Sequence, residues 1–157
     1  MKYVLFVSIM ILISGCASKY KEPTIGEYAT ITIPHNKTKY NFGFSGESYL
    51  ISILNETSCV DSWQIIEEKN KDKEFETIKI PVGKNIAINS FLYSGNSNCR
   101  LVGTFKSEIG KNYALSSKII GDTCYMYVSE KNNNQEIFIK INILKIENSM
   151  TGKMCFK

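Results

Sequence analysis

The residues with the widest range of chemistry in this 157-residue chain are five cysteines and a single histidine. A thiol group can form a disulfide, bind a metal ion as a thiolate or carry a covalent modification, and its spacing and compartment decide which. Cys16 directly follows an apolar stretch near the start of the sequence. The other cysteines are widely spaced, and they are Cys59, Cys99, Cys124 and Cys155.

The four widely spaced cysteines favour disulfides over a metal site. Zinc ligands usually come in tight local pairs such as C-x-x-C, and no such pair is present. An even number of cysteines in an exported chain is typical of disulfides. Four cysteines allow three connectivities, and the sequence does not choose among them. We expect Cys99–Cys124, between strands near each other in sequence, and Cys59–Cys155, which would tie the tail to the body. We expect no metal ion and no cofactor.

The first sixteen residues have the order of an export signal. Lys2 supplies a positive charge, and residues 3–13 are apolar apart from one serine. This stretch is short of the roughly 20 residues that a helix needs to span a bilayer, and it has the proportions of a signal peptide. It ends in Ile13-Ser14-Gly15-Cys16, with small residues before a cysteine. This order resembles the lipobox of bacterial lipoproteins, which implies a signal peptide over 1–15 and lipidation of Cys16.

The resemblance also implies how the protein is held at a membrane. In lipoproteins the cysteine sulfur receives a diacylglyceryl group, the chain is cut before that cysteine, and the new amine can be acylated. Each buried methylene contributes about 0.8 kcal/mol, so two or three acyl chains on Cys16 would anchor the protein stably. Ala17 stands where Asp would favour inner-membrane retention, which favours the outer membrane, facing the periplasm. We expect residues 16–26 to form the lipidated cysteine and a short polar tether, and 27–157 a single β domain.

The charge distribution argues against nucleic acid as a partner. The formal net charge is +4, but lysines alternate with acids along the chain, as in 67–74, and Arg100 is the only arginine. Proteins that read nucleic acids rely on arginine side chains and on clustered basic patches. The 43% hydrophobic and 22% charged residues are ordinary for one globular domain.

From residue 27 onward the dominant hydrophobic period is two, which predicts β-strands because successive side chains of a strand point to opposite faces. For residues 61–71 a helix competes with a strand, and we expect a strand over 62–67 followed by a charged loop. Pro, Gly and Asn separate the strands, as at 81–84 and 108–111. We expect an all-β fold, a small antiparallel β-sandwich stapled by disulfides. The clearest alternations cover 28–33, 49–54, 86–89, 101–105, 113–119, 124–128 and 137–143.

Residues 80–128 show a further pattern. A Gly-Lys turn at 83–84 precedes one expected strand, and Gly110-Lys111-Asn112-Tyr113 opens another. This pattern resembles small uncharacterised envelope lipoproteins of bacteria, which are thought of as β-sandwiches without known catalysis. The resemblance implies the same fold for this chain and no particular ligand.

No pattern in the sequence points to catalysis. His35, the only histidine, lies in a turn-like stretch after Pro34, and we expect a solvated surface residue there. The sequence has no G-x-S-x-G, H-E-x-x-H or glycine-rich phosphate loop. The paired carboxylates at 67–68 fit a solvated loop. We therefore expect no catalytic residue and no enzyme.

Two sets of alternating aromatic residues have two interpretations. Tyr40, Phe42 and Phe44 form one set, while Tyr125 and Tyr127 lie on the opposite face of a strand from Met126. Such a set either forms an exposed stripe for a partner or a glycan, or covers the second face of a sheet. Large aromatic side chains are usually well buried, so we expect core or sheet-cover roles.

Together these patterns predict a lipid-anchored, non-enzymatic component of the cell envelope that binds an envelope protein through a sheet edge or a loop face. An alternative is an inhibitor or immunity lipoprotein that neutralises a toxin or a cell-wall hydrolase. A basic net charge and exposed loops would suit an acidic target of that kind.

Overall fold

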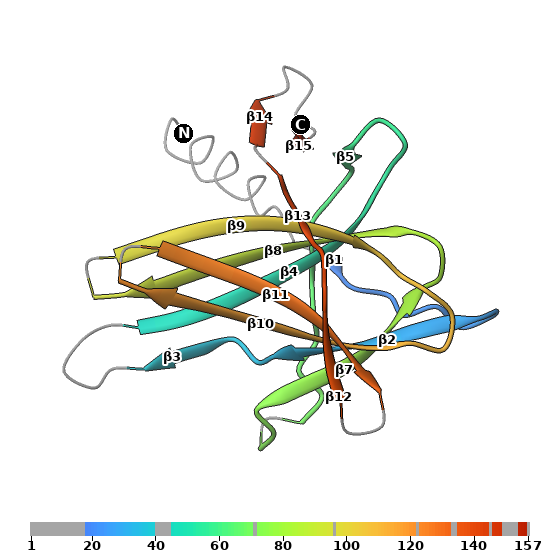
Figure 1. Ribbon diagram of the computed structural model, residues 1–157, viewed down its shortest axis with the longest axis horizontal. Helices are drawn as coiled ribbons and strands as arrows, with labels where there is room; N and C mark the ends of the chain where they lie inside the picture. Colours follow the sequence, from blue (N-terminus) through green and yellow to red (C-terminus); the bar gives the residue numbers. More distant parts are fainter. Residues whose placement is uncertain are drawn as a thin grey trace, which may run out of the picture.

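Alternating apolar residues build two β-sheets that pack face to face, as a computed structural model of the chain shows (Figure 1). Within the described residues there are strands and turns and no helix, which confirms the all-β sandwich and rules out a helix over 61–70. The residues that the structure describes are 18–39, 45–70, 72–95, 97–121, 123–132, 135–144, 146–148 and 154–156.

The first sheet is centred on three long antiparallel strands, β4, β8 and β9, joined in that order. Its strand order in the described chain is β1-β6-β4-β8-β9-β13, and β3 also pairs with β4. The bounds are β1 (Ser18–Lys19), β3 (Lys37–Lys39), β4 (Ser45–Leu54), β6 (Gln64–Ile65), β8 (Asn85–Ser94), β9 (Ser97–Lys106) and β13 (Asn142–Leu144).

The second sheet has the strand order β12-β11-β10-β2-β7 in the described residues. Its pairs are antiparallel except β10 with β2, which run parallel. A small third sheet joins β14, β15 and β5. The bounds are β2 (Tyr28–Pro34), β5 (Cys59–Val60), β7 (Phe75–Pro81), β10 (Asn112–Ile120), β11 (Thr123–Asn132), β12 (Gln135–Ile139), β14 (Ile146–Asn148) and β15 (Met154–Phe156).

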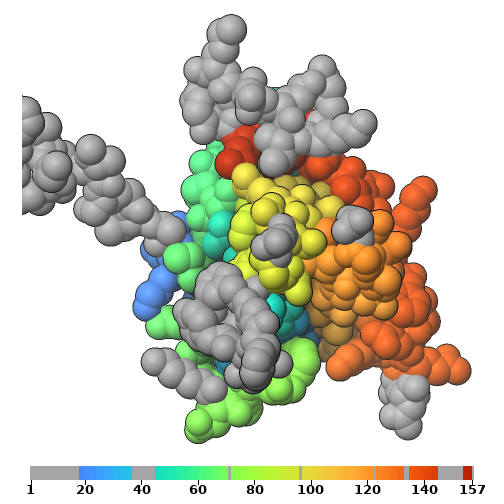
Figure 2. Space-filling model, turned by 90° about the vertical axis from the view of Figure 1, so that its left-hand side faces the viewer, coloured from blue at the N-terminus to red at the C-terminus, as the bar shows by residue number. Residues whose placement is uncertain are grey.

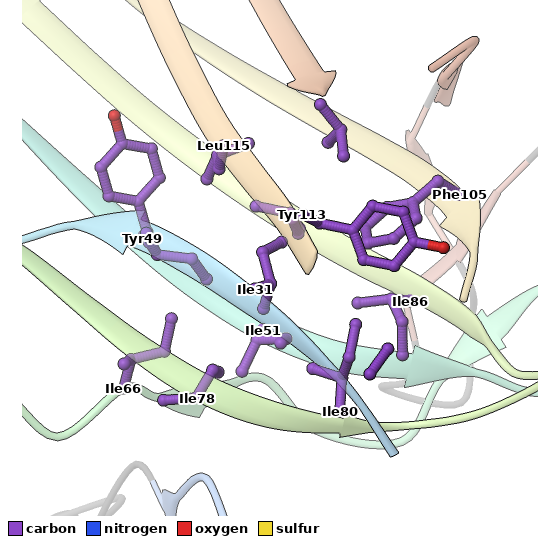
Figure 3. Packing of buried hydrophobic residues seen from close by; sticks show 14 of the residues in the cluster. Ile31, Tyr49, Ile51, Ile66, Ile78, Ile80, Ile86, Phe105, Tyr113 and Leu115 are labelled. Atoms are coloured by element: carbon purple, nitrogen blue, oxygen red, sulfur yellow. The ribbon is translucent and has the colours of Figure 1, made fainter. Parts of the chain in front are cut away.

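The core lies between the first and second sheets. Isoleucine dominates it, because a β-branched side chain packs well on a pleated surface. Figure 3 shows Ile31 of the second sheet and Ile51 of the first among side chains that converge from both layers. Fully burying one such side chain stabilises the fold by about 1.5–3 kcal/mol. Others in the cluster are Ile33, Tyr49, Ile78, Ile80, Ile86, Ile88, Phe105, Tyr113, Leu115 and Val128.

A second apolar cluster covers the other face of the first sheet. Phe156 from the C-terminal segment and Val60 pack against Ala87 and Val102, with Trp63 beside them. Strand β8 is therefore buried on both faces over half of its length, from Ile86 to Ser90. The period-two pattern at 86–89 indicates a strand, but it does not reveal this second covering layer.

Both disulfides have the predicted pairing. Cys99–Cys124 joins β9 of the first sheet to β11 of the second, so it staples the two layers together. Cys59–Cys155 joins β5 to β15 and holds the C-terminal segment on the first sheet.

Two strand predictions from the sequence are wrong in detail. Residues 137–143 are not one strand, because the chain leaves the second sheet after Ile139 and enters the first at Asn142. Ile139, at the end of β12, and Ile141, just before β13, both pack against the core. The alternation of apolar residues therefore continues through the segment in which the chain changes sheets. The strand expected over 62–67 is limited to β6, and the sequence patterns did not identify β7.

Removing the disulfides one at a time should have unequal effects. The chain-entropy model assigns about 4.7 kcal/mol to Cys59–Cys155 and about 3.5 kcal/mol to Cys99–Cys124, because they span 96 and 25 residues respectively. We expect the double variant C59A/C155A to lose more free energy of unfolding than C99A/C124A. Urea denaturation followed by circular dichroism measures both, and the reverse order would contradict this account.

Candidate functional site

The segment that follows Ala17 is docked on the domain. Ser18 and Lys19 pair in parallel with β6, and the Tyr20 amide donates a hydrogen bond of 2.8 Å to the carbonyl oxygen of Ile65. The Tyr20 hydroxyl donates to the carbonyl oxygen of Lys79 at 3.0 Å, and burial raises the pKa of Tyr20 to about 12. Residues 18–22 of the expected tether thus lie against the domain. Cys16 itself lies outside the described residues.

Glu22 fixes the end of this docked segment. Its carboxylate accepts hydrogen bonds from Lys69 Nζ and, at 2.9 Å, from the backbone amide of Lys79. The hydrogen bond from Lys69 is the largest cause that lowers the pKa of Glu22 below its ordinary value. The nearby pair of Lys19 and Glu67 is exposed to solvent and contributes little.

Acidification should release this segment. Because the pKa of Glu22 in the folded protein is below its ordinary value of 4.5, the ionised carboxylate stabilises docking above that pH. This contribution is lost as the pH falls through the lowered pKa. We expect the NMR amide shift of Lys79 to titrate below pH 4.5 in the native chain and to lose that titration in E22Q. The matched variant E67Q should titrate as the native chain does, and an unchanged titration in E22Q would contradict the assignment.

His35 lies inside the protein, so the surface position expected for it is wrong. It is 5% exposed, and its Nε2 atom lies 3.5 Å from Glu76 Oε2. The chain passes from β2 of the second sheet to β3 of the first at this point, and a residue at such a crossing faces the space between the layers. Asn36 secures the crossing, since its Oδ1 atom accepts a hydrogen bond of 2.9 Å from the Tyr49 amide.

The surroundings of His35 leave little room for a ligand. The hollow beside it has a volume of only about 10 Å³, which is space for about one water molecule. No group of three or more His, Cys, Asp or Glu side chains in the described part of the chain is placed to hold a metal ion. His35 and Glu76 are best described as a buried structural pair at a change of sheet.

A polar cluster lies between the sheets near one end of the sandwich. The Tyr49 hydroxyl hydrogen-bonds to Glu47 Oε2 at 2.8 Å and to Ser117 Oγ at 2.6 Å, and Ser90 contacts Ser117. A hollow of about 340 Å³ lies nearby, lined by residues of β4, β8 and β10. Figure 2 views this end, with the paired ends of β8 and β9 in yellow beside those of β10 and β11 in orange. The hydroxyls of the cluster satisfy one another, so it secures the contact between the layers.

The outer face of the second sheet carries an exposed aromatic cluster. The rings of Tyr125 and Tyr127 are parallel to within 1°, with centroids 6.1 Å apart. Phe138 of β12 meets Tyr127 edge-on at 6.0 Å and is 69% exposed. The two tyrosines lie on the outer face of the second sheet and not in the core, and Tyr125 is 38% exposed there. The other expected set, Tyr40, Phe42 and Phe44, lies outside the described residues.

Polar groups surround these rings and complete a groove across β10, β11 and β12. The groove has a volume of about 340 Å³. Lys118 Nζ lies 5.5 Å from the centre of the Tyr127 ring, and the buried Ser129 hydroxyl donates to Glu136 Oε1. We call this site the aromatic groove, and it is lined by Ser116, Lys118, Tyr127, Ser129, Glu136 and Phe138.

Sequence reasoning identified only part of the aromatic groove. The alternation around Met126 placed Tyr125 and Tyr127 together on one face, and the structure confirms that Met126 is on the buried side. The neighbours of these rings depend on strand register: Ser129 is opposite Phe138, and Tyr127 is opposite Ser116. No local pattern specifies which residues a register brings together.

Comparisons with known proteins give no indication of function. No protein-family model, curated protein sequence or solved structure matches this chain. Nor does the described chain contain a helix with the length and hydropathy to cross a membrane.

Proposed function

We propose that this chain is a lipid-anchored, non-enzymatic binding protein of the bacterial cell envelope. The lipobox at Ile13-Ser14-Gly15-Cys16 supports the anchor, and the outer face of the second sheet is the proposed binding surface. The observation that carries the binding role is the aromatic cluster on this face, in which Tyr125 and Phe138 are exposed and Tyr127 and Phe138 line a groove. Aromatic side chains gathered on a surface cost free energy in water and commonly mark a site of interaction.

The docked N-terminal segment supports a defined orientation at the membrane. Only Ala17 separates the proposed lipidated Cys16 from Ser18, the first residue of β1. Two extended residues span at most about 7 Å, so the lipid would lie close to the edge formed by β1 and β6.

The proposed binding surface faces away from that edge. Tyr20 bonds to Lys79 on β7, and the strand order puts β7 and β12 at opposite edges of the second sheet. The aromatic groove lies on β10, β11 and β12. An anchor at one edge would therefore leave the groove accessible on the opposite side of the domain.

The anchor is tested by metabolic labelling. In bacteria grown with labelled palmitate, the native chain should carry the label and C16A should carry none, because the acyl chains attach through the cysteine sulfur or to the amine freed by cleavage. S14A keeps a small residue before the cysteine and should be labelled as the native chain is. A native chain without label would sink the proposed anchor.

The binding surface is tested by cross-linking in cells. A photo-cross-linking amino acid at position 138 should give adducts with envelope material. The same amino acid at position 91 is the matched control, because Phe91 is also exposed, at 42%, but lies on the first sheet. Equal yields at positions 138 and 91 would show that the outer face of the second sheet is not the contact surface.

A further inference from the structure

We propose that the aromatic groove binds a glycan, with sugar rings lying against the aromatic side chains and sugar hydroxyls bonding to Glu136 and the serines. This inference rests on the proposed function, because it names the ligand class for the same face. The proposed binding is non-covalent.

The aromatic side chains supply the surface that a sugar ring needs. A pyranose ring presents C–H groups on its faces and hydroxyls around its rim, so it packs against an aromatic face while its rim stays polar. Tyr125 and Tyr127 are parallel and next to each other along one strand, and Phe138 stands exposed beside them on the next strand. Tyr125 and Phe138 are the exposed rings of the cluster, so they are the ones available to a sugar chain.

The polar groups of the groove are held in place before any ligand arrives. Ser129, itself buried, donates to Glu136 Oε1, which orients the carboxylate while leaving further lone pairs for sugar hydroxyls. Ser116 adds a hydroxyl that can donate or accept. A carboxylate with hydroxyl neighbours satisfies the donors on the rim of a sugar, and a preorganised site loses less conformational entropy on binding.

The charge balance of the groove favours a sugar over an anionic polymer and over an apolar peptide or acyl chain. The positive charge of Lys118 is offset by the negative charge of Glu136, and Lys118 lies against the Tyr127 ring. A strongly anionic polymer would be repelled by the Glu136 carboxylate, and binding such a polymer requires clustered cations. An apolar peptide or acyl chain would bury the carboxylate and the ammonium without partners, at a large cost in free energy. The volume of about 340 Å³ is within the range of sites for small ligands.

The binding test uses the full chain purified in detergent. The probes are insoluble peptidoglycan sacculi, in a co-sedimentation assay, and a soluble tetrasaccharide of N-acetylglucosamine, in a calorimetric titration. We expect saturable binding of at least one probe. F138A and Y125A should weaken it by about tenfold each, on the scale of one aromatic contact. F91A, an exposed ring on the other sheet, should bind as the native chain does.

Two substitutions at position 138 separate a sugar from an apolar partner. F138Y keeps the aromatic face and should keep the affinity, whereas F138L keeps apolar bulk without a ring and should weaken binding as F138A does. E136Q, which removes the charge but keeps a polar side chain of similar size, should weaken binding less than F138A. Thermal unfolding of each variant checks that the fold is intact, which is expected because Phe138 is exposed.

The outcomes are distinct. Absence of binding to both probes by the native chain, or unchanged binding by F138A, would overturn the glycan inference. Full binding by F138L would overturn it in favour of an apolar partner. If the cross-linker at position 138 captures a protein in cells while neither probe binds, the proposed binding role stands and the glycan inference falls. If position 138 and the control position give equal adducts, the proposed binding surface itself falls.

Discussion

The structure depends on burying the isoleucine-rich inner faces of two sheets against each other. The layers approach so closely that β9 has a glycine, Gly103, opposite Met126: a Cβ atom at that position would lie 2.8 Å from the Met126 sulfur. Cys99–Cys124 staples the same two strands, β9 and β11, further along. This contact supplies most of the apolar burial in the described chain, and every other feature is arranged around it.

Because both inner faces are used in the core, the two outer faces are free to differ. The outer face of the first sheet is covered in part by Phe156 and Trp63, next to Cys59–Cys155, while Phe91 of β8 stays exposed on it. On the outer face of the second sheet Phe138 and Tyr125 remain exposed. The rings on the second sheet differ from Phe91 in lying beside a groove with polar groups, which supports the proposed role in binding.

The N-terminal segment links this architecture to the proposed anchor. Tyr20 and Glu22 tie the chain to β7 through Lys79, so hydrogen bonds fix the position of residues 20–22 on the domain. The aromatic groove lies at the other edge of the second sheet. An anchored domain built in this way would hold its binding face at a fixed orientation, with a small entropic cost for meeting an extended ligand.

Period two is a local property of the backbone, so alternation in the sequence predicts the all-β class, most of the long strands and the opposite faces of Met126 and Tyr127, but it misses β7. The sequence leaves three disulfide connectivities open, and the structure has the expected one, Cys59–Cys155 with Cys99–Cys124. Only the tertiary structure decided that His35 is buried, that residues 137–143 change sheets and that Phe138 meets Tyr127. These outcomes depend on strand order and register, which are set by contacts between segments far apart in the sequence, and local alternation carries no information about them.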